Sequence, residues 1–229
     1  MNTIVSAFIN LNKFRNVEFY KTHGLKLLEL PCPKIIFMDT SLIHTFKSFE
    51  NEITKIIPIT FDEIYLSKYN LTNGTNSTNP TKDTIEYFMI QCNKTEWVRQ
   101  AIELNLYQSS NYIWVDFGIH YIFHEPVNFN FSKDYSKIRI PSIWDTSIVY
   151  GADIYKDVHW YFAGSVFGGD SKILIQFADL MKEKCESIIK EKNILMWEVN
   201  IWYLIWKEHP ELFDRYKVST HDHTMINNY

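Results

Sequence analysis

Short apolar runs recur along this chain, and segments with the spacing of amphipathic helices separate most of them. The runs are rich in β-branched residues and contain few polar positions, which is typical of strands buried on both faces of a parallel sheet. The predicted strands are residues 3–9, 34–38, 54–59, 112–115, 137–140 and 160–166. Because helical segments alternate with these strands, we expect an α/β fold with a mostly parallel central sheet flanked by helices.

The helical patterns predict four longer segments. They are residues 14–23, residues 84–104 with a break near Cys92 and Asn93, residues 171–190 and residues 196–206. Gly24 is expected to stop the first helix, and Gly168 and Gly169 are expected to form the turn before the third. A polar tail is expected to follow the last helix.

Residues 70–82 contain almost no apolar side chain and many turn formers, which predicts an exposed polar loop. The chain has 229 residues, of which 46% are hydrophobic, enough for one sizeable core. We therefore interpret residues 1–229 as a single domain in which residues 70–82 form a loop rather than a linker.

The net charge of −4 and the dispersed lysines and arginines argue against a nucleic-acid partner. The N-terminal residues have no basic region, and no segment approaches the ~20 apolar residues of a membrane-spanning helix. The three cysteines are widely spaced and fit reduced thiols. A soluble cytoplasmic protein is expected, and the abundance of Asn, Ile, Lys and Tyr suggests an AT-rich bacterial or giant-virus-like genome.

Two acidic residues, Asp39 and Asp116, follow predicted strands directly. The carboxyl ends of parallel strands form the ligand-binding edge of an open α/β sheet. Asp116 enters a turn with Gly118, where a carboxylate suits Mg²⁺ or Mn²⁺ and a glycine lets a phosphate approach the backbone. The alternative is a solvated aspartate that caps the next helix.

Other candidate groups are less specific. His120 lies just beyond this turn, and the tail contains His221 and His223, which are metal ligands or ordinary surface and core histidines. Glycines at 164, 168 and 169 surround a strand-to-helix junction, where they shape a sugar or phosphate site or only allow tight packing. Glu198 and Asn200 are polar in an apolar helix, so the carboxylate should face a cleft or pair with a cation. The alternative is that they lie in a solvent-exposed first turn of that helix.

Taken in order, several segments resemble the HtrL/YibB-type family, a bacterial family to which glycosyl transfer is ascribed. The resemblance covers nearly the whole chain, and YIWVDFGI is its most specific segment. The segments are TIVSAF at 3–8, IIFMD at 35–39, YIWVDFGI at 112–119, FAGSVFGG at 162–169, HPELF at 209–213 and the final Asn228-Tyr229. The resemblance implies a GT-A-like nucleotide-sugar-binding fold.

It also implies a hexosyltransferase-like enzyme that takes a sugar from a nucleotide-diphosphate donor, a UDP-sugar, to a glycan or protein acceptor. Asp116 stands at the first acid of the D-x-D metal motif, and Gly118 replaces the second. The Mn²⁺ or Mg²⁺ site would then need diphosphate oxygens, water, or one of His120, His221 and His223.

The resemblance assigns the remaining roles as follows. The donor would be bound by Ala7, Phe8, Asp39, Lys94, Asp116, Phe117, Gly118, Gly164, Gly168 and Gly169. Lys94 would neutralise a phosphate, unless it is a surface lysine. Glu198 and Asn200 match the family's acidic and amide positions near the last helix, and Glu198 would orient sugar hydroxyls or take the acceptor proton.

Two other functions fit the same residues. A metal-dependent phosphohydrolase would use Asp116 and the histidines to bind metal and activate water. A catalytically degraded nucleotide-sugar-binding protein would explain why Gly118 and Val199 replace acidic residues of the family pattern. The oligomeric state is left open.

Overall fold

The computed structural model describes residues 2–11, 16–75, 77, 79–145 and 153–229. Its centre is a seven-stranded sheet with the order β3-β2-β1-β5-β7-β6-β9. The strands are β1 (Asn2–Phe8), β2 (Lys34–Asp39), β3 (Thr54–Ile59), β5 (Asn111–Val115), β6 (Ile138–Ser142), β7 (Val166–Asp170) and β9 (Phe213–Lys217). A small second sheet pairs β4 (Thr72–Asn73) with β8 (Ile194–Leu195).

The central sheet is parallel apart from β7, which runs antiparallel to both β5 and β6. In the register of β5 and β7, Val115 lies opposite Val166. The carboxyl ends of the other strands and the amino end of β7 therefore meet at one edge of the sheet. In parallel α/β sheets this edge is where ligands bind.

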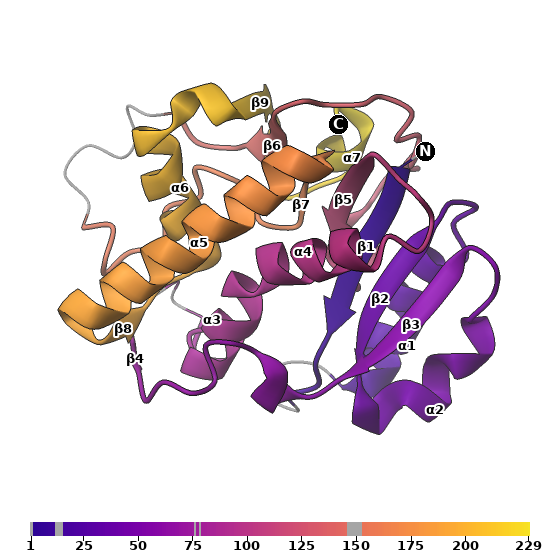
Figure 1. Cartoon of the computed structure of the whole chain (residues 1–229), viewed down its shortest axis with the longest axis horizontal. Helices are drawn as coiled ribbons and strands as arrows, with labels where there is room; N and C mark the ends of the chain where they lie inside the picture. The colour runs from indigo at the N-terminus through magenta and orange to yellow at the C-terminus, as the bar shows by residue number, and fades with distance from the viewer. Residues whose placement is uncertain (1, 12–15, 76, 78, 146–152) are drawn as a thin grey trace.

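Helices cover both faces of the sheet, as predicted, and Figure 1 shows α4 and α5 crossing in front of it. The helices are α1 (Val17–Leu28), α2 (Ile43–Phe46), α3 (Ile85–Cys92), α4 (Lys94–Leu104), α5 (Ser171–Lys192), α6 (Glu198–Glu208) and α7 (Thr224–Asn227). Shorter 3₁₀ turns are η1 (Thr40–Leu42), η2 (Lys47–Phe49), η3 (Phe61–Glu63), η4 (Ile119–Ile122) and η6 (Pro210–Leu212). No helix in these described ranges has the length and apolar character needed to cross a membrane.

Two hydrophobic cores lie on the two faces of the sheet. Val5 and Trp114 belong to the core under α3, α4, α5 and α6, whereas their chain neighbours Ile4 and Ile113 belong to the core under α1, α2 and α7. Successive side chains of a strand point to opposite faces, so both neighbours must be apolar when both faces are covered. This explains the unbroken apolar runs from which the strands were predicted.

Side chains at the helix ends satisfy free backbone groups. The N-cap side chains of Asn16, Thr84 and Asp170 accept hydrogen bonds from the first turns of α1, α3 and α5. Asn105 and Asn193 end α4 and α5 in the left-handed conformation, with φ of 44° and 55°.

Four local predictions differ from the structure. Gly24 lies inside α1 and does not stop the helix. A Cβ at this position would come within 2.1 Å of the Phe117 ring, so the glycine allows the helix to pack closely against that ring. Residues 14 and 15 of the predicted helix lie outside the described residues. Strand β7 begins at Val166, where the predicted strand was to end, so Gly168 and Gly169 lie within the strand and not in a turn. The expected polar tail contains β9, which forms an edge of the sheet.

The segment 70–82 is exposed only in part. Its strand β4 pairs with β8, and Leu71 and Thr75 are buried. The Thr75 hydroxyl oxygen accepts a hydrogen bond of 3.0 Å from the backbone N–H of Trp197. The loop is thereby attached to the turn that begins α6.

Candidate active site

Two adjoining cavities open at the carboxyl edge of the sheet. The first, called here the apolar cavity, has a volume of about 130 Å³ and is lined by the end of β1, by Tyr20 and by the turn after β5. The second, called the tryptophan cavity, has a volume of about 440 Å³ and is lined by Trp144, Trp160 and Trp197 among others. Lys94 and Asp116 line both cavities, so they stand where the two spaces meet.

Asp116 follows the last residue of β5 and is fixed in place by its neighbours. Its backbone N–H donates to the Ser165 carbonyl at 2.9 Å, which extends the pairing of β5 with β7. Its Oδ1 accepts a 2.8 Å hydrogen bond from the indole N–H of Trp114. The side chain is 33% exposed, so a ligand in either cavity can reach it.

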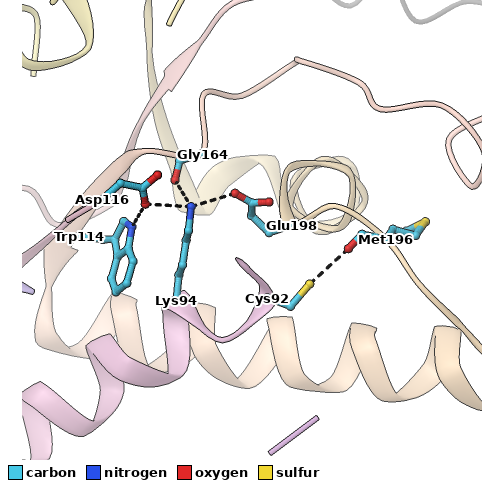
Figure 2. Close-up of polar contacts among 7 residues, drawn as sticks. All are labelled: Cys92, Lys94, Trp114, Asp116, Gly164, Met196 and Glu198. Atoms are coloured by element: carbon cyan, nitrogen blue, oxygen red, sulfur yellow. Dashed lines mark hydrogen bonds and ion pairs between the residues drawn. The ribbon is translucent and has the colours of Figure 1, made fainter. Parts of the chain in front are cut away.

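Lys94, the first residue of α4, is completely buried beside Asp116 (Figure 2). Its Nζ lies 3.0 Å from Asp116 Oδ1, 3.0 Å from Glu198 Oε1 and 2.9 Å from the Gly164 carbonyl oxygen. Burial alone would lower the pKa of Lys94, but the two carboxylates together raise it above its ordinary value. The side chain is therefore a fixed cation at neutral pH.

The phosphate-binding role expected for Lys94 stays a prediction, but its contacts here are with protein oxygens. An ammonium group has three N–H donors, and here three oxygens accept from them. A phosphate that bound Lys94 directly would have to replace or share one of these three contacts. Lys94 holds the carboxylates of Asp116 and Glu198 on either side of one positive charge.

Glu198 begins α6 and is 1% exposed, although it lines the tryptophan cavity. Its Oε1 binds Lys94, whereas its Oε2 is buried and has no hydrogen-bond partner. The helix N-terminus favours a carboxylate at this position. A Cβ on Gly164 would lie 2.2 Å from Glu198 Oε1, so a glycine is required for the carboxylate to reach Lys94.

The structure gives Asn200 a structural role. Its Oδ1 accepts from the His159 backbone N–H at 2.8 Å, and its Nδ2 donates to the carbonyls of Ile154 and Asp157 at 2.7 and 2.8 Å. The buried amide of Asn200 thus has protein partners for both its oxygen and its nitrogen, and it anchors the backbone between Ile154 and His159. Asn200 lines neither cavity.

The predicted donor-binding residues separate into two groups. Ala7, Phe8, Phe117 and Gly118 line the apolar cavity, and Gly164 lines the tryptophan cavity. The others lie away from both cavities: Asp39, Gly168 and Gly169.

These three residues have other contacts. Asp39 accepts hydrogen bonds from the backbone N–H groups of Asn10 and Ser41 at 3.0 and 2.9 Å. It thereby holds the backbone that follows β1, but it lines neither cavity. A Cβ on Gly168 would meet the Tyr229 hydroxyl at 2.1 Å, and one on Gly169 would meet Ile173 at 2.8 Å. Close packing in the middle of the sheet is the reason for both glycines.

The three predicted histidine ligands are not together. His221 lines the tryptophan cavity, where burial and the charges of Lys82 and Lys94 lower its pKa to about 4 against the opposing effect of Asp116. His120 lies against Phe123 and Phe129, with its pKa lowered to about 4, chiefly by burial.

His223 pairs with Glu125 at 3.3 Å, outside both cavities. Within the described ranges, no cluster of three or more His, Cys, Asp or Glu side chains forms a metal site.

Residues 8–224 match the model of a family described as "Bacterial protein of unknown function (HtrL_YibB)". The chain belongs to this family. The predicted family membership is thus confirmed, and the segments YIWVDFGI and FAGSVFGG contribute Asp116 and Gly164 to the site.

Two solved structures are similar to this HtrL_YibB protein over most of its length. Mouse xyloside xylosyltransferase 1 in its apo form has a TM-score of 0.48 and 10% identity, with 94% of this chain and 85% of that chain covered. A glycosyltransferase involved in the glycosylation of the major capsid of PBCV-1 has a TM-score of 0.43 and 8% identity, with 94% of this chain and 81% of that chain covered. No curated protein matches the sequence.

Sequence reasoning missed the aromatic residues of the HtrL_YibB site. Tyr87 lines both cavities, and Trp160 and Trp197 line the second. In the sequence these residues lie among many other aromatics that fill the core, since Phe, Trp and Tyr make up 16% of the chain. Only their position beside Asp116 and Glu198 distinguishes them.

Proposed function

We propose that this HtrL_YibB protein is a glycosyltransferase that moves a sugar from a nucleotide-diphosphate donor, a UDP-sugar, to an acceptor hydroxyl. The observation that carries the proposal is the pair of carboxylates, Asp116 and Glu198, held 3.0 Å from one buried ammonium where two cavities meet. Fixed charges in a largely buried site stabilise developing charge without having to reorganise. A reaction with two substrates, donor and acceptor, needs two adjoining spaces.

The apolar cavity would receive the nucleoside. Phe8 packs against Tyr20 and Phe117, with ring centroids 4.2 and 5.7 Å apart, and Ala7 and Gly118 complete the wall near the end of β1. An apolar, partly aromatic wall suits a planar base. The diphosphate would then extend from this cavity toward Asp116.

The charges of the site support a metal requirement. Lys94 is engaged by two carboxylates, so the diphosphate must find its counter-charge elsewhere. Asp116 is partly exposed, and His221 in the same cavity is uncharged at neutral pH, the form that ligates a metal. Asp116 and His221 would hold Mn²⁺ or Mg²⁺, which neutralises the leaving diphosphate when bound. His120 and His223 lie elsewhere and take no part.

Glu198 would orient the transferred sugar. Its Oε2 is a buried acceptor without a partner, and a sugar hydroxyl is a donor that fits it. During transfer the bond from the anomeric carbon to the diphosphate oxygen breaks with its electron pair leaving on the diphosphate. The acceptor oxygen bonds to that carbon, and its proton is released to solvent.

Calorimetry with UDP and GDP, each with and without MnCl₂, tests the proposal. Wild-type protein should bind UDP more tightly with MnCl₂, and Asp116→Asn should lose that enhancement. Asp134→Asn, which changes an exposed aspartate in the loop before β6, is the matched control and should behave as wild type. A Mn²⁺ enhancement that persists in Asp116→Asn would contradict the metal assignment.

Incubation with a UDP-sugar then distinguishes the functions. Slow release of UDP from the sugar nucleotide supports transfer, because glycosyltransferases pass the sugar to water when no acceptor is present. Binding without any release would indicate a degraded binding protein. Cleavage of p-nitrophenyl phosphate without nucleotide binding would indicate a phosphohydrolase.

We expect the reaction to take place in the cytoplasm. Cys32, Cys92 and Cys185 are free thiols, as in reducing compartments. Thiol titration of protein purified under native conditions, without added reductant, checks this: three free thiols per chain are expected.

A further inference from the structure

One wall of the tryptophan cavity consists of indole rings fixed by their neighbours. The half-buried Trp160 packs edge-to-face with Trp197 at 5.3 Å and with His221 at 4.8 Å between ring centroids. A ring held in this way offers a flat apolar surface and loses little side-chain freedom when a ligand covers it. The C–H faces of pyranose rings pack on aromatic surfaces of this kind, because the weakly positive C–H groups meet the negative face of the ring.

A carboxylate side chain, that of Glu198, belongs to the lining of the same cavity. Glu198 Oε2 is buried without a partner, and leaving such an acceptor unsatisfied costs about 1–3 kcal/mol. A carboxylate has about four lone-pair sites, so Glu198 can accept from a hydroxyl of the transferred sugar and from one of the acceptor. Indole rings and a carboxylate in the lining of one cavity match a molecule that carries hydroxyls at its edge and C–H groups on its face. A carbohydrate has this combination of groups.

The charges around the cavity disfavour an anionic acceptor. The residues that line it include two lysines, Lys82 and Lys94, and two carboxylates, Asp116 and Glu198, so the charges of these four side chains balance. Lys94 already donates to three oxygens. The described residues that line the tryptophan cavity therefore have no surplus positive charge. A phosphate group of a lipid or of a phosphopeptide would find no free cation among them beside the donor diphosphate.

We infer that the acceptor is a neutral carbohydrate, and that one of its pyranose rings packs against Trp160 in the tryptophan cavity. The inference rests on the proposed glycosyl transfer and narrows its acceptor from a glycan or protein to a glycan. Trp160 is a specificity-determining residue for the acceptor. The nucleoside contacts lie in the apolar cavity, which Trp160 does not line.

Saturation-transfer NMR with methyl β-glycosides of glucose, galactose and xylose tests the inference, in the presence of UDP and MnCl₂. Wild-type protein should saturate the ring C–H protons of at least one glycoside. Trp160→Ala should reduce that signal at least fivefold, and Trp160→Phe should keep part of it because a ring remains. Trp206→Ala is the matched control, since Trp206 is also half-buried but packs on Tyr161 and Arg215 and lines neither cavity. Circular dichroism confirms that each variant is folded.

The outcomes separate this inference from the proposed function. If calorimetry shows UDP binding but no glycoside is saturated, the carbohydrate acceptor is wrong while the transferase proposal stands. An unchanged signal in folded Trp160→Ala, or saturation of a serine-containing peptide in place of the glycosides, also overturns the inference. If UDP itself does not bind, the proposed function fails first.

Discussion

Lys34 and Lys94 are both enclosed by the protein, with exposed fractions of 0% and 1%, yet their surroundings differ. Lys34 begins β2, and its Nζ donates to the carbonyls of Leu30 and Cys32. Burial lowers the pKa of Lys34, and the nearby Cys32 thiol opposes this only in part. Lys94 lies between two carboxylates, and its pKa is raised.

The difference shows what each lysine does. The two carbonyl groups accept hydrogen bonds from the Lys34 ammonium but carry no negative charge. Lys34 therefore holds the turn before β2, and the free-energy cost of burying its charge is not offset by an opposite charge. Two carboxylates offset the charge of Lys94 and are in turn held by it. A buried ion cluster at the ligand-binding edge of the sheet indicates function, whereas a buried lysine capped by carbonyls is part of the scaffold.

The largest expected effect comes from removing the site cation. Lys94→Met would leave Asp116 and Glu198 facing each other with the buried Glu198 carboxylate unpaired, so we expect the free energy of unfolding to fall by about 3–5 kcal/mol. Urea unfolding followed by tryptophan fluorescence measures this. Lys172→Met, at an exposed position of α5, is the matched control.

A second substitution sharpens this test. Adding Glu198→Gln to Lys94→Met should recover part of the loss, because the stranded buried charge is removed. A double variant less stable than the single one would contradict the account of the pair.

Gly164→Ala should have the next largest effect. Its Cβ would meet Glu198 Oε1 at 2.2 Å and separate the carboxylate from Lys94, which should cost about 1–3 kcal/mol. Gly118→Ala is the control for stability, because there the nearest atoms are 3.3 Å away on the Tyr20 ring. Equal losses of unfolding free energy in the two variants would show that Glu198 has room to move.

A smaller effect concerns His221, which lies beside the same charges. Its pKa is lowered from 6.5 to about 4 in the folded protein, so between these values the unfolded chain binds more protons. The free energy of unfolding should therefore fall as the pH falls from 7 to 5. The contribution of His221 is expected to be about 2 kcal/mol. Comparing wild type with His221→Gln at the two pH values isolates it, and identical pH profiles would mean that the imidazole is not buried.

Lys34→Met should have the smallest effect, below about 1 kcal/mol, because it strands two neutral carbonyls but also removes a poorly compensated charge. The same urea titration measures it. A loss as large as that of Lys94→Met would remove the distinction between the two lysines.

Local patterns were sufficient for the fold class and for most of the sheet. Strands β1, β2 and β5 are buried along almost their whole length and consist mostly of apolar residues, so their sequences carry the signal of a covered parallel strand directly. The edge strand β9 reads FDRYK, with polar residues between two aromatics, and was hidden in an apparently polar tail. The start of β7 was misplaced because two glycines, which usually indicate a turn, lie within this strand to allow Tyr229 and Ile173 to approach.

The chain by itself determined where single groups of the site would be. A strand that ends in a carboxylate placed Asp116 at the ligand-binding edge, and a carboxylate in an apolar helix indicated that Glu198 needs a cation or a cleft. Both inferences use only local sequence and the general cost of burying charge.

Only the tertiary structure decided which partner each group has. Lys94 reaches Glu198 across 104 positions of the chain, and Asn200, which lies two residues beyond Glu198, points to the backbone before β7. His221 enters the cavity, whereas His223 turns to Glu125. Such pairings depend on how helices and strands that are distant in sequence pack together. Neither the spacing nor the periodicity of residues along the chain specifies which of these elements come into contact.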